Sequence, residues 1–316
     1  FKSLSKLNIP ILAFGGVNSK ELINDIIAID NVSLTLDQGK VLGIVGESGS
    51  GKSVTAKSIM QLNPGNTIYN DDAEIIIDNE NVLKFTSKND LKKIRGGKVS
   101  MIFQEPMASF APAIKIGNQM IEQLLLHKET DKNQAKQISI DMLNRVGIAD
   151  AEKRFNQYAF ELSGGMRQRA MIAMALSTMP KLLLADEPTT ALDVTIQAQV
   201  INLMKDIIKE YNMGVIFITH DLGVIAQVAD DVAVMYLGSV VERGPVNEIL
   251  KNPKHPYTRG LLNALPDINN LDAPLKPIPG NIPSPLDRPA ACVFRTRCPN
   301  PTHDCKEGNI EMGLIE

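Results

Sequence analysis

The sequence contains no tryptophan, and its three cysteines all fall within the last 25 residues. An odd number of cysteines confined to one end provides no disulfide framework and favours a cytosolic protein. No apolar run approaches the roughly 18 residues of a membrane-spanning helix, and the N-terminal apolar residues are too few for a secretory signal. Lysine and arginine total 33 against 36 acidic residues, so no basic excess suggests a nucleic-acid-binding protein.

Apolar residues make up 44% of the chain, enough for a substantial core. Its length of 316 residues suggests about two domains. Prolines from 253 to 289 indicate an extended tail with one short helix at 257–265. Before the tail, alternating strand and helix patterns predict an α/β core with an all-helical insert over 114–147. The predicted strands are 28–36, 41–45, 75–77, 99–103, 181–185, 214–219, 232–236 and 240–242.

A glycine-rich segment, Gly46–Ser53, matches the pattern G-x-x-x-x-G-K-[ST] between a predicted strand and a predicted helix. The helix is expected to start at Lys52 and to end at Pro64-Gly65. Glycines let successive backbone N–H groups face phosphates, while Lys52 can reach the β- and γ-phosphates and Ser53 can bind Mg²⁺. The segment predicts a nucleotide phosphate site.

An apolar strand, 182–185, is followed by two acids, Asp186 and Glu187. Adjacent carboxylates at the end of a buried strand are costly unless a cation lies nearby. Asp186 therefore suits a Walker-B residue that holds Mg²⁺, and Glu187 suits a base that polarises the attacking water. The alternative is a capping pair for a helix that starts near Pro188-Thr189.

A third motif, Leu162-Ser163-Gly164-Gly165-Met166, is expected to open a helix that continues through Met179. Such a start presents backbone N–H donors to an anion. Helix capping by Ser163 is the alternative interpretation. It does not account for the place of the motif between the glycine-rich segment Gly46–Ser53, the P-loop, and the acidic strand.

Together with Gln104 in Met101–Pro106 and His220 in Ile218–Asp221, these motifs resemble an ABC-transporter ATPase. Within that family the chain is similar to the D-type ATPases of bacterial dipeptide, oligopeptide or nickel importers. This narrower resemblance rests on Gly-Lys-Ser-Val ending at Val54, Phe103–Met107 and His255–Thr258. It implies a P-loop NTPase (RecA-like) core with an antiparallel β subdomain and an inserted helical subdomain at about 107–165. The ATPase domain would span 1–250, and a Pro- and Cys-containing C-terminal extension would span 251–316.

The resemblance also implies ATP as substrate, Mg²⁺ as cofactor and a set of site residues. Phe14 would stack on the base, although it could equally be a core residue of the first strand. Catalytic roles would fall to Lys52, Gln104, Glu187 and His220, and Mg²⁺ binding to Ser53, Gln104 and Asp186. ATP would contact Phe14, Gly46, Glu47, Ser48, Gly49, Ser50, Gly51, Lys52, Ser53 and Val54, and a partner's ATP would contact Ser163, Gly164, Gly165 and Asp193 in trans.

The tail carries Cys292-x5-Cys298-x6-Cys305, and three clustered thiols can bind metal. Similar tails in peptide-importer ATPases hold a [4Fe–4S] cluster with four cysteines. A fourth ligand would lie beyond Glu316 or be His303, and free thiols are the alternative. The chain begins at Phe1 rather than Met, so we expect the original N-terminus to be absent or processed.

The resemblance predicts an ATP-hydrolysing subunit that powers peptide import at the cytoplasmic face of the cell membrane. ATP would close a dimer and hydrolysis would reopen it. The implied partners are a second ABC ATPase in a heterodimer, two transmembrane permease subunits and an extracytoplasmic substrate-binding protein, with no nucleic acid. The alternatives are a nickel or other small-solute importer ATPase, a soluble ABC ATPase in DNA repair or translation, and a non-enzymatic regulatory or iron–sulfur protein.

Overall fold

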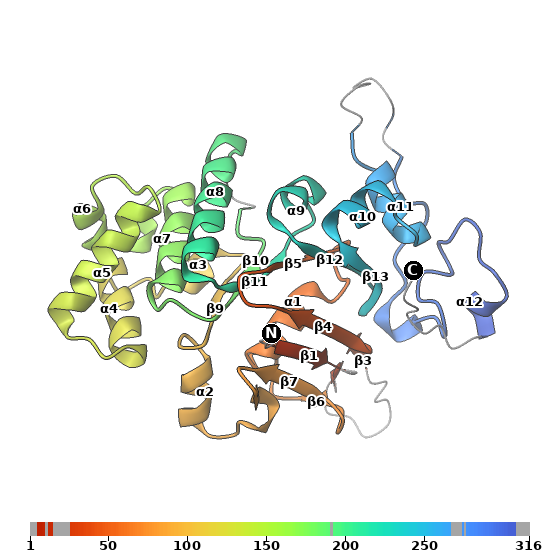
Figure 1. The fold of residues 1–316 in the computed structure, drawn as a ribbon, viewed down its shortest axis with the longest axis horizontal. Coiled ribbons are helices and arrows are strands. Elements are labelled where there is room, and N and C mark those ends of the chain that lie inside the picture. Colours follow the sequence, from red (N-terminus) through yellow and green to blue (C-terminus); the bar gives the residue numbers. More distant parts are fainter. Residues whose placement is uncertain are drawn as a thin grey trace. The chain divides into compact units, whose positions relative to one another are not determined.

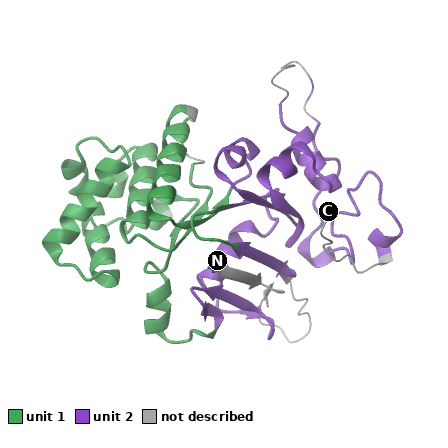
Figure 2. Cartoon of the chain, viewed as in Figure 1, with its two compact units in different colours: residues 1–4, 36–41, 84–218 green, residues 5–35, 42–83, 219–316 purple. Residues whose placement is uncertain are grey.

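The computed structural model describes residues 5–9, 12–14, 26–189, 192–266, 274 and 276–307. The chain folds into two compact units made of interleaved segments (Figure 2). Unit 1 comprises residues 1–4, 36–41 and 84–218, and unit 2 comprises residues 5–35, 42–83 and 219–316.

Unit 1 contains three parallel strands (Figure 1). They are β9 (Val99–Ile102), β10 (Leu182–Asp186) and β11 (Gly214–Ile218), with β10 between the other two. Every residue of these strands is buried. Burial on both faces is the reason that their sequences are mostly apolar and do not alternate with exposed polar residues.

The predicted helical insert is confirmed as two helices, α4 (Ile116–His127) and α5 (Lys132–Arg145). Asp131 begins α5, because its carboxylate accepts hydrogen bonds from the backbone N–H groups of Asn133 at 2.7 Å and Gln134 at 3.0 Å. The other helical elements of the unit are α2 (Lys88–Ile94), α3 (Pro106–Ser109), α6 (Ala151–Phe155), η2 (Ala159–Glu161), α7 (Gly164–Ser177) and α8 (Val194–Tyr211).

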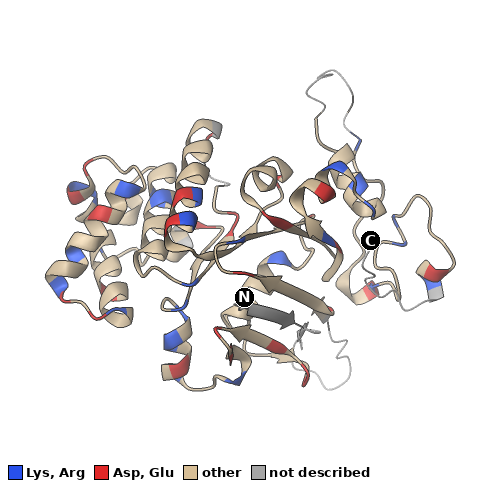
Figure 3. Ribbon diagram, in the orientation of Figure 1, with Lys and Arg blue, Asp and Glu red and all other residues tan. Residues whose placement is uncertain are grey.

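Charged residues of both signs lie along the helices of unit 1 (Figure 3). Lys136 and Glu152 pair at 3.4 Å, and Arg145 pairs with Glu210. The Lys136–Glu152 pair is largely exposed, and exposed pairs contribute little to stability. We infer that the helical part of this unit is held together chiefly by its apolar faces.

Close packing of α4 against α6 gives a first testable expectation. A Cβ at Gly117 would overlap the ring of Phe155, which is buried. Gly117→Ala should therefore lower the free energy of unfolding by about 1–3 kcal/mol, as measured by urea denaturation. Gly65→Ala is the matched control, because a Cβ there meets no atom within 4 Å. Equal effects of the two substitutions would contradict this account of the packing.

Unit 2 contains β5 (Val41–Val45) parallel to β12 (Asp231–Tyr236), which pairs antiparallel with β13 (Ser239–Pro245). The strands predicted at 41–45, 232–236 and 240–242 are thereby confirmed. The helical elements are α1 (Lys52–Ile59), η1 (Val82–Lys84), α9 (Leu222–Val228), α10 (Val246–Lys251), α11 (Pro256–Asn263), η3 (Pro285–Asp287) and α12 (Asp304–Glu307).

Two smaller sheets complete unit 2 and supply the predicted antiparallel β subdomain. One has the strand order β4 (Val32–Leu36), β1 (Ser5–Ile9), β7 (Glu74–Ile77), β8 (Glu80–Asn81). The other has the order β3 (Ile26–Ile29), β2 (Leu12–Phe14), β6 (Thr67–Tyr69). Strand β4 alternates buried and exposed residues, as its sequence predicts.

Helix α1 ends at Ile59, earlier than the predicted stop at Pro64-Gly65. Gln61 takes the left-handed conformation, with a φ of 50°. The N–H of Gln61 then bonds the carbonyl of Ser58 at 3.0 Å, and the N–H of Leu62 bonds that of Lys57 at 2.8 Å. This Schellman pattern usually needs glycine, so glutamine at position 61 did not predict the end of the helix there. Among the described helices of both units, none combines the length and apolar character needed to cross a bilayer.

Candidate functional site

The loop Gly46–Ser53 connects β5 to α1 in unit 2. Gly46 has a φ of 153°, and a Cβ there would overlap the carbonyl oxygen of Met235. Gly51 precedes the helix with a φ of 100°, which disfavours any residue with a side chain. Both positions therefore require glycine. The backbone N–H groups at the start of α1 lie next to this loop without a side-chain cap, an arrangement that suits an anion.

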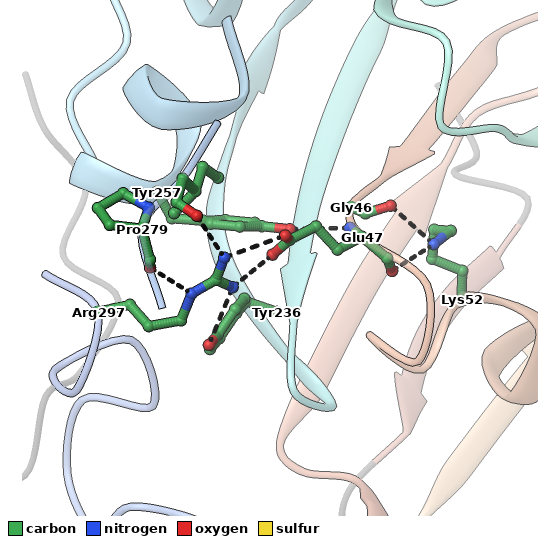
Figure 4. Close-up of polar contacts among 8 residues, drawn as sticks. Gly46, Glu47, Lys52, Tyr236, Tyr257, Pro279 and Arg297 are labelled. Carbon is green, nitrogen blue, oxygen red and sulfur yellow. Dashed lines mark hydrogen bonds and ion pairs between the residues drawn. The ribbon is translucent and has the colours of Figure 1, made fainter. Parts of the chain in front are cut away.

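Lys52 places a positive charge at this loop. Its side chain is buried, and its ammonium donates hydrogen bonds to the carbonyl oxygens of Gly46 and Glu47, both at 2.8 Å (Figure 4). It also lies 3.3 Å from the hydroxyl oxygen of Ser50. A cationic donor beside a glycine-rich loop provides the positive charge that a phosphate requires.

The turn that carries His220 lies beside the strand that leads into this loop. The N–H of Thr219 donates to the carbonyl of Ile44 in β5 at 3.3 Å. Asp221 caps α9 by accepting from the N–H groups of Gly223 at 2.8 Å and Val224 at 3.2 Å. Both contacts fix the backbone on either side of His220, whose side chain is exposed. Unit 2 thus brings His220 to the same edge as the loop.

The acidic pair lies at the end of β10 in unit 1. Asp186 is only 3% exposed. Glu187 has a φ of 48°, and its N–H bonds the carbonyl of Ile218 in β11 at 2.8 Å. A left-handed backbone costs about 1–2 kcal/mol for such a residue, so its neighbours hold it there. The next helix begins only at Val194, and Asp193 caps it. The capping interpretation of the acidic pair is therefore wrong.

Gln104 and Glu187 are in direct contact. The Nε2 amide of Gln104 donates to Oε2 of Glu187 at 3.1 Å. The contact follows from the strand register, because Ile102 of β9 lies opposite Ala185 of β10. Both strands are parallel and therefore end at the same edge of the sheet. The amide holds the carboxylate of Glu187 in place.

Ser163 is the N-cap of α7, since its hydroxyl accepts from the N–H of Met166 at 3.3 Å. Both Ser163 and Gly164 are exposed, and a Cβ at Gly164 would meet nothing within 4 Å. The predicted start of this helix is confirmed, and its end at Ser177 comes two residues before Met179. The start of α7 is therefore open to an incoming group.

Gln168 links this helix to the segment that follows Asp186 and Glu187. No sequence pattern assigned it a role. It is fully buried in α7, and its side-chain amide donates to the carbonyl of Pro188, next to Glu187. A buried polar side chain inside an apolar helix is the only signal that could have drawn attention to it. We infer that Gln168 fixes the backbone that follows Glu187.

The chain matches the ABC transporter family over residues 29–190. It also matches the C-terminal region of oligopeptide/dipeptide transporters over residues 241–305. It is 49% identical over 280 residues to the oligopeptide transport ATP-binding protein AppD of Bacillus subtilis, an alignment that covers 88% of this chain and 84% of the relative. This chain belongs to the ABC transporter family.

Further relatives agree with this ABC transporter assignment. The dipeptide transport ATP-binding protein DppD of Bacillus subtilis is 45% identical over 298 residues, covering 94% of this chain and 86% of the relative. A solved ATP-binding cassette, the dimeric structure of a post-hydrolysis state bound to ADP and Pi, superposes with a TM-score of 0.66 at 25% identity. That superposition covers 77% of this chain and 98% of the solved one. The predicted P-loop NTPase fold is confirmed.

Not every predicted site residue of this ABC transporter chain can be placed. Phe14 is the last residue of β2 and pairs with Thr67 of β6, but its side chain lies outside the described part of the structure, so the stacking prediction stays a prediction. Thr190 and Ala191, which precede Asp193, also lie outside the described residues.

The cysteine tail differs from the prediction of a metal site. Cys292, Cys298 and Cys305 are half-buried free thiols. The N–H of Cys292 donates to the carbonyl of Cys305 at 3.4 Å. Within the described ranges, no three His, Cys, Asp or Glu residues form a group able to hold a metal ion. The [4Fe–4S] prediction, including His303 as a ligand, is therefore not supported by the described residues.

These thiols should differ in reactivity. Burial raises the pKa of Cys292, whereas hydrogen bonding to Thr302 lowers the pKa of Cys305. Because the thiolate is the nucleophile, Cys305 should react several-fold faster with iodoacetamide at pH 7.5, and the difference should shrink as the pH rises and Cys292 also ionises. Mass spectrometry of the labelled peptides measures the rates. Thr302→Val should slow Cys305, and protection of all three thiols would instead indicate a metal-bound tail.

Proposed function

We propose that this ABC transporter chain is the ATP-hydrolysing subunit that powers the import of peptides, both dipeptides and oligopeptides, across a membrane. The observation that carries the proposal is the match at both ends of the chain. One match is to the ABC transporter family and the other to the C-terminal region of oligopeptide/dipeptide transporters. The relatives reported above carry names of oligopeptide and dipeptide transport proteins. Neither match supports the nickel, DNA-repair or translation alternatives.

ATP would bind to unit 2 through the loop Gly46–Ser53 and the adjoining Val54. The glycine positions fit this role, because a Cβ at Gly46 would fill the loop and the helix start behind it has no side-chain cap. Backbone N–H groups would bind the phosphate oxygens. Lys52, which now donates to loop carbonyls, would donate to the β- and γ-phosphates instead.

Mg²⁺ would be held by oxygen donors, namely the hydroxyl of Ser53, the amide oxygen of Gln104 and the carboxylate of Asp186. These are the ligand types that Mg²⁺ prefers, and the buried carboxylate of Asp186 at the end of β10 suits a cation. When bound, the ion neutralises charge on the phosphates. This assignment rests on the chemistry of the donors.

Glu187 would act as the base that polarises the attacking water. Its support is the contact with Gln104, which orients the carboxylate from one side. His220 would contact the γ-phosphate and orient Glu187, consistent with its exposure on a fixed turn beside β5.

Two such chains would share each ATP. Ser163, Gly164, Gly165 and Asp193 would contact the nucleotide bound by a partner ATPase, and the exposed start of α7 supports this role. ATP would close the dimer and hydrolysis would reopen it. The remaining proposed partners are a paralogous ATPase, two permease subunits and an extracytoplasmic binding protein. The chain would then work at the cytoplasmic face of the membrane, with the ATPase domain at 1–250 and the extension at 251–316.

Affinity purification of the full-length chain from its own membranes, followed by mass spectrometry, tests this proposal. We expect two multi-span permease chains and a second ATPase to co-purify. Peptide-stimulated ATP hydrolysis by the reconstituted complex would then establish the cargo. Recovery of ribosomal or DNA-repair proteins without a permease would overturn the transport role and leave the ATPase chemistry standing.

A further inference from the structure

The C-terminal extension contacts the P-loop directly, through Glu47. The carboxylate of Glu47 accepts two hydrogen bonds from the guanidinium of Arg297, at 2.7 Å and 3.2 Å (Figure 4). The backbone N–H of Glu47 donates to the hydroxyl of Tyr257 at 2.8 Å. Arg297 lies 250 residues and Tyr257 lies 210 residues from Glu47 in the sequence. Residues of the extension therefore hold the second position of the P-loop by both its side chain and its backbone.

The guanidinium of Arg297 is buried and uses its N–H groups in contacts with this region. Its side chain is 4% exposed, against 28% for that of Glu47. Besides Glu47, it donates to the carbonyl oxygens of Pro279 at 3.0 Å and Ile278 at 3.2 Å, and to the hydroxyl of Tyr236 at 3.5 Å. These contacts use all of the N–H donors that a guanidinium has. The side chain is thus fixed in one orientation, and Glu47 is the anion that balances its buried charge.

An aromatic cluster anchors this part of the extension. Tyr236, Tyr257 and Phe294 are completely or almost completely buried. The ring centroid of Tyr236 lies 4.7 Å from that of Tyr257 and 5.2 Å from that of Phe294. Tyr236 is the last residue of β12, the neighbour of the strand that leads into the P-loop. The cluster therefore fastens the extension to the sheet next to the loop.

The position of Tyr257 is itself determined by the start of α11. The carboxylate of Glu242 in β13 accepts from the N–H groups of Lys254 at 2.6 Å and His255 at 3.0 Å. The Nδ1 atom of His255 then accepts from the N–H of Tyr257 at 3.2 Å. Because β13 is part of the sheet, these hydrogen bonds fix the start of α11, and with it the position of the Tyr257 hydroxyl.

A second arginine of the extension acts at the other end of the loop. The N–H of Gly238 donates to the carbonyl of Ser50 at 3.0 Å. Arg288 donates to the carbonyl of Leu237 and, at 2.7 Å, to the carboxylate of Asp30. It thereby supports the turn that holds Ser50. The loop is therefore held at its beginning by Tyr257 and Arg297 and near its end by Gly238, all of which come much later in the sequence.

A glycine-rich loop loses much conformational freedom when it closes around phosphates. Contacts that order the loop beforehand reduce this entropic cost and raise affinity. We propose that Arg297 and Tyr257 are positioning residues of the nucleotide site, which hold Glu47 and thereby keep the P-loop in its phosphate-binding conformation. This inference rests on the proposed binding of ATP. It assigns the extension a part in nucleotide affinity, beyond any part in peptide transport.

The test is the dissociation constant of a fluorescent ATP analogue, measured with Mg²⁺ on the full-length chain. Arg297→Met should weaken binding about tenfold, which is about 1.4 kcal/mol. Glu47→Gln should have a similar effect, and the double variant should be no weaker than either single variant, because both remove the same contact. Arg297→Lys should restore part of the affinity. For Arg297→Met, the turnover rate at saturating ATP should stay within about twofold of the original while KM rises.

Arg295→Met is the matched control, because Arg295 lies two positions away and donates to the carbonyl of Lys306 at 3.0 Å, remote from the loop. It should leave the dissociation constant unchanged. If Arg297→Met does not fold, as judged by circular dichroism, Tyr257→Phe decides the question, since it removes only the hydroxyl and should weaken binding several-fold.

Unchanged affinity in folded Arg297→Met, or in Tyr257→Phe, would overturn the inference, and so would additive effects of Glu47→Gln and Arg297→Met. An unaltered chain that binds no nucleotide would instead refute the proposed function. The two failures are therefore distinguishable.

Discussion

Glu187→Gln should slow ATP hydrolysis by a factor of about 10² to 10⁴, the usual contribution of a general base, and should leave ATP binding intact. Glutamine keeps the shape of the side chain and can still contact Gln104, which bonds Glu187 at 3.1 Å. It cannot accept a proton from the attacking water. Single-turnover hydrolysis measures the loss, and size-exclusion chromatography with ATP should show an accumulated dimer.

Glu122→Gln is a suitable control, because Glu122 is an exposed carboxylate on α4. It should hydrolyse ATP at the original rate. Normal turnover by the Glu187 variant would remove Glu187 from the role of base. The hydrogen bond between Gln104 and Glu187 would then have a structural role only.

Lys52→Ala should reduce ATP affinity by about one to two orders of magnitude. A charge-assisted hydrogen bond contributes about 1.5–3 kcal/mol, and Lys52 is the cation held against the loop carbonyls of Gly46 and Glu47 at 2.8 Å. Equilibrium binding of a fluorescent ATP analogue measures the change. Lys57→Ala, on the exposed face of the same helix, should bind ATP as the unaltered chain does. Equal affinities of the two variants would contradict a phosphate contact by Lys52.

Local sequence patterns predicted those parts of the fold that depend on neighbouring residues. Strand β5 was predicted with its observed bounds, Val41–Val45, because a continuous apolar run meets a glycine-rich loop there. Ser163 was predicted as a helix start and is the cap of α7. Where a non-glycine residue takes the left-handed conformation, as Gln61 does at the end of α1, the pattern carries no signal and the predicted boundary was wrong.

Contacts between distant residues could not be predicted. The role of Gln104 was assigned through the family resemblance, and that of Glu187 from its place after an apolar strand. Their hydrogen bond, however, depends on the register of β9 and β10. No pattern within the sequence relates Arg297 to Glu47, because a bidentate ion pair across 250 positions leaves no periodicity. The cysteine spacing suggested a metal site, yet spacing alone does not determine whether thiols converge on one point.

The ion pair between Arg297 and Glu47 limits how this protein can be recombined. A chimaera that takes its last 66 residues, 251–316, from a distant relative would replace Arg297, the partner of Glu47, by whatever residue that relative has there. Where that relative lacks an arginine at the equivalent position, the carboxylate of Glu47 would lose its ion-pair partner. Gene fusions that combine the nucleotide-binding domain of one relative with the tail of another should bind ATP more weakly for this reason, and grafts should keep their affinity when loop and tail are exchanged together.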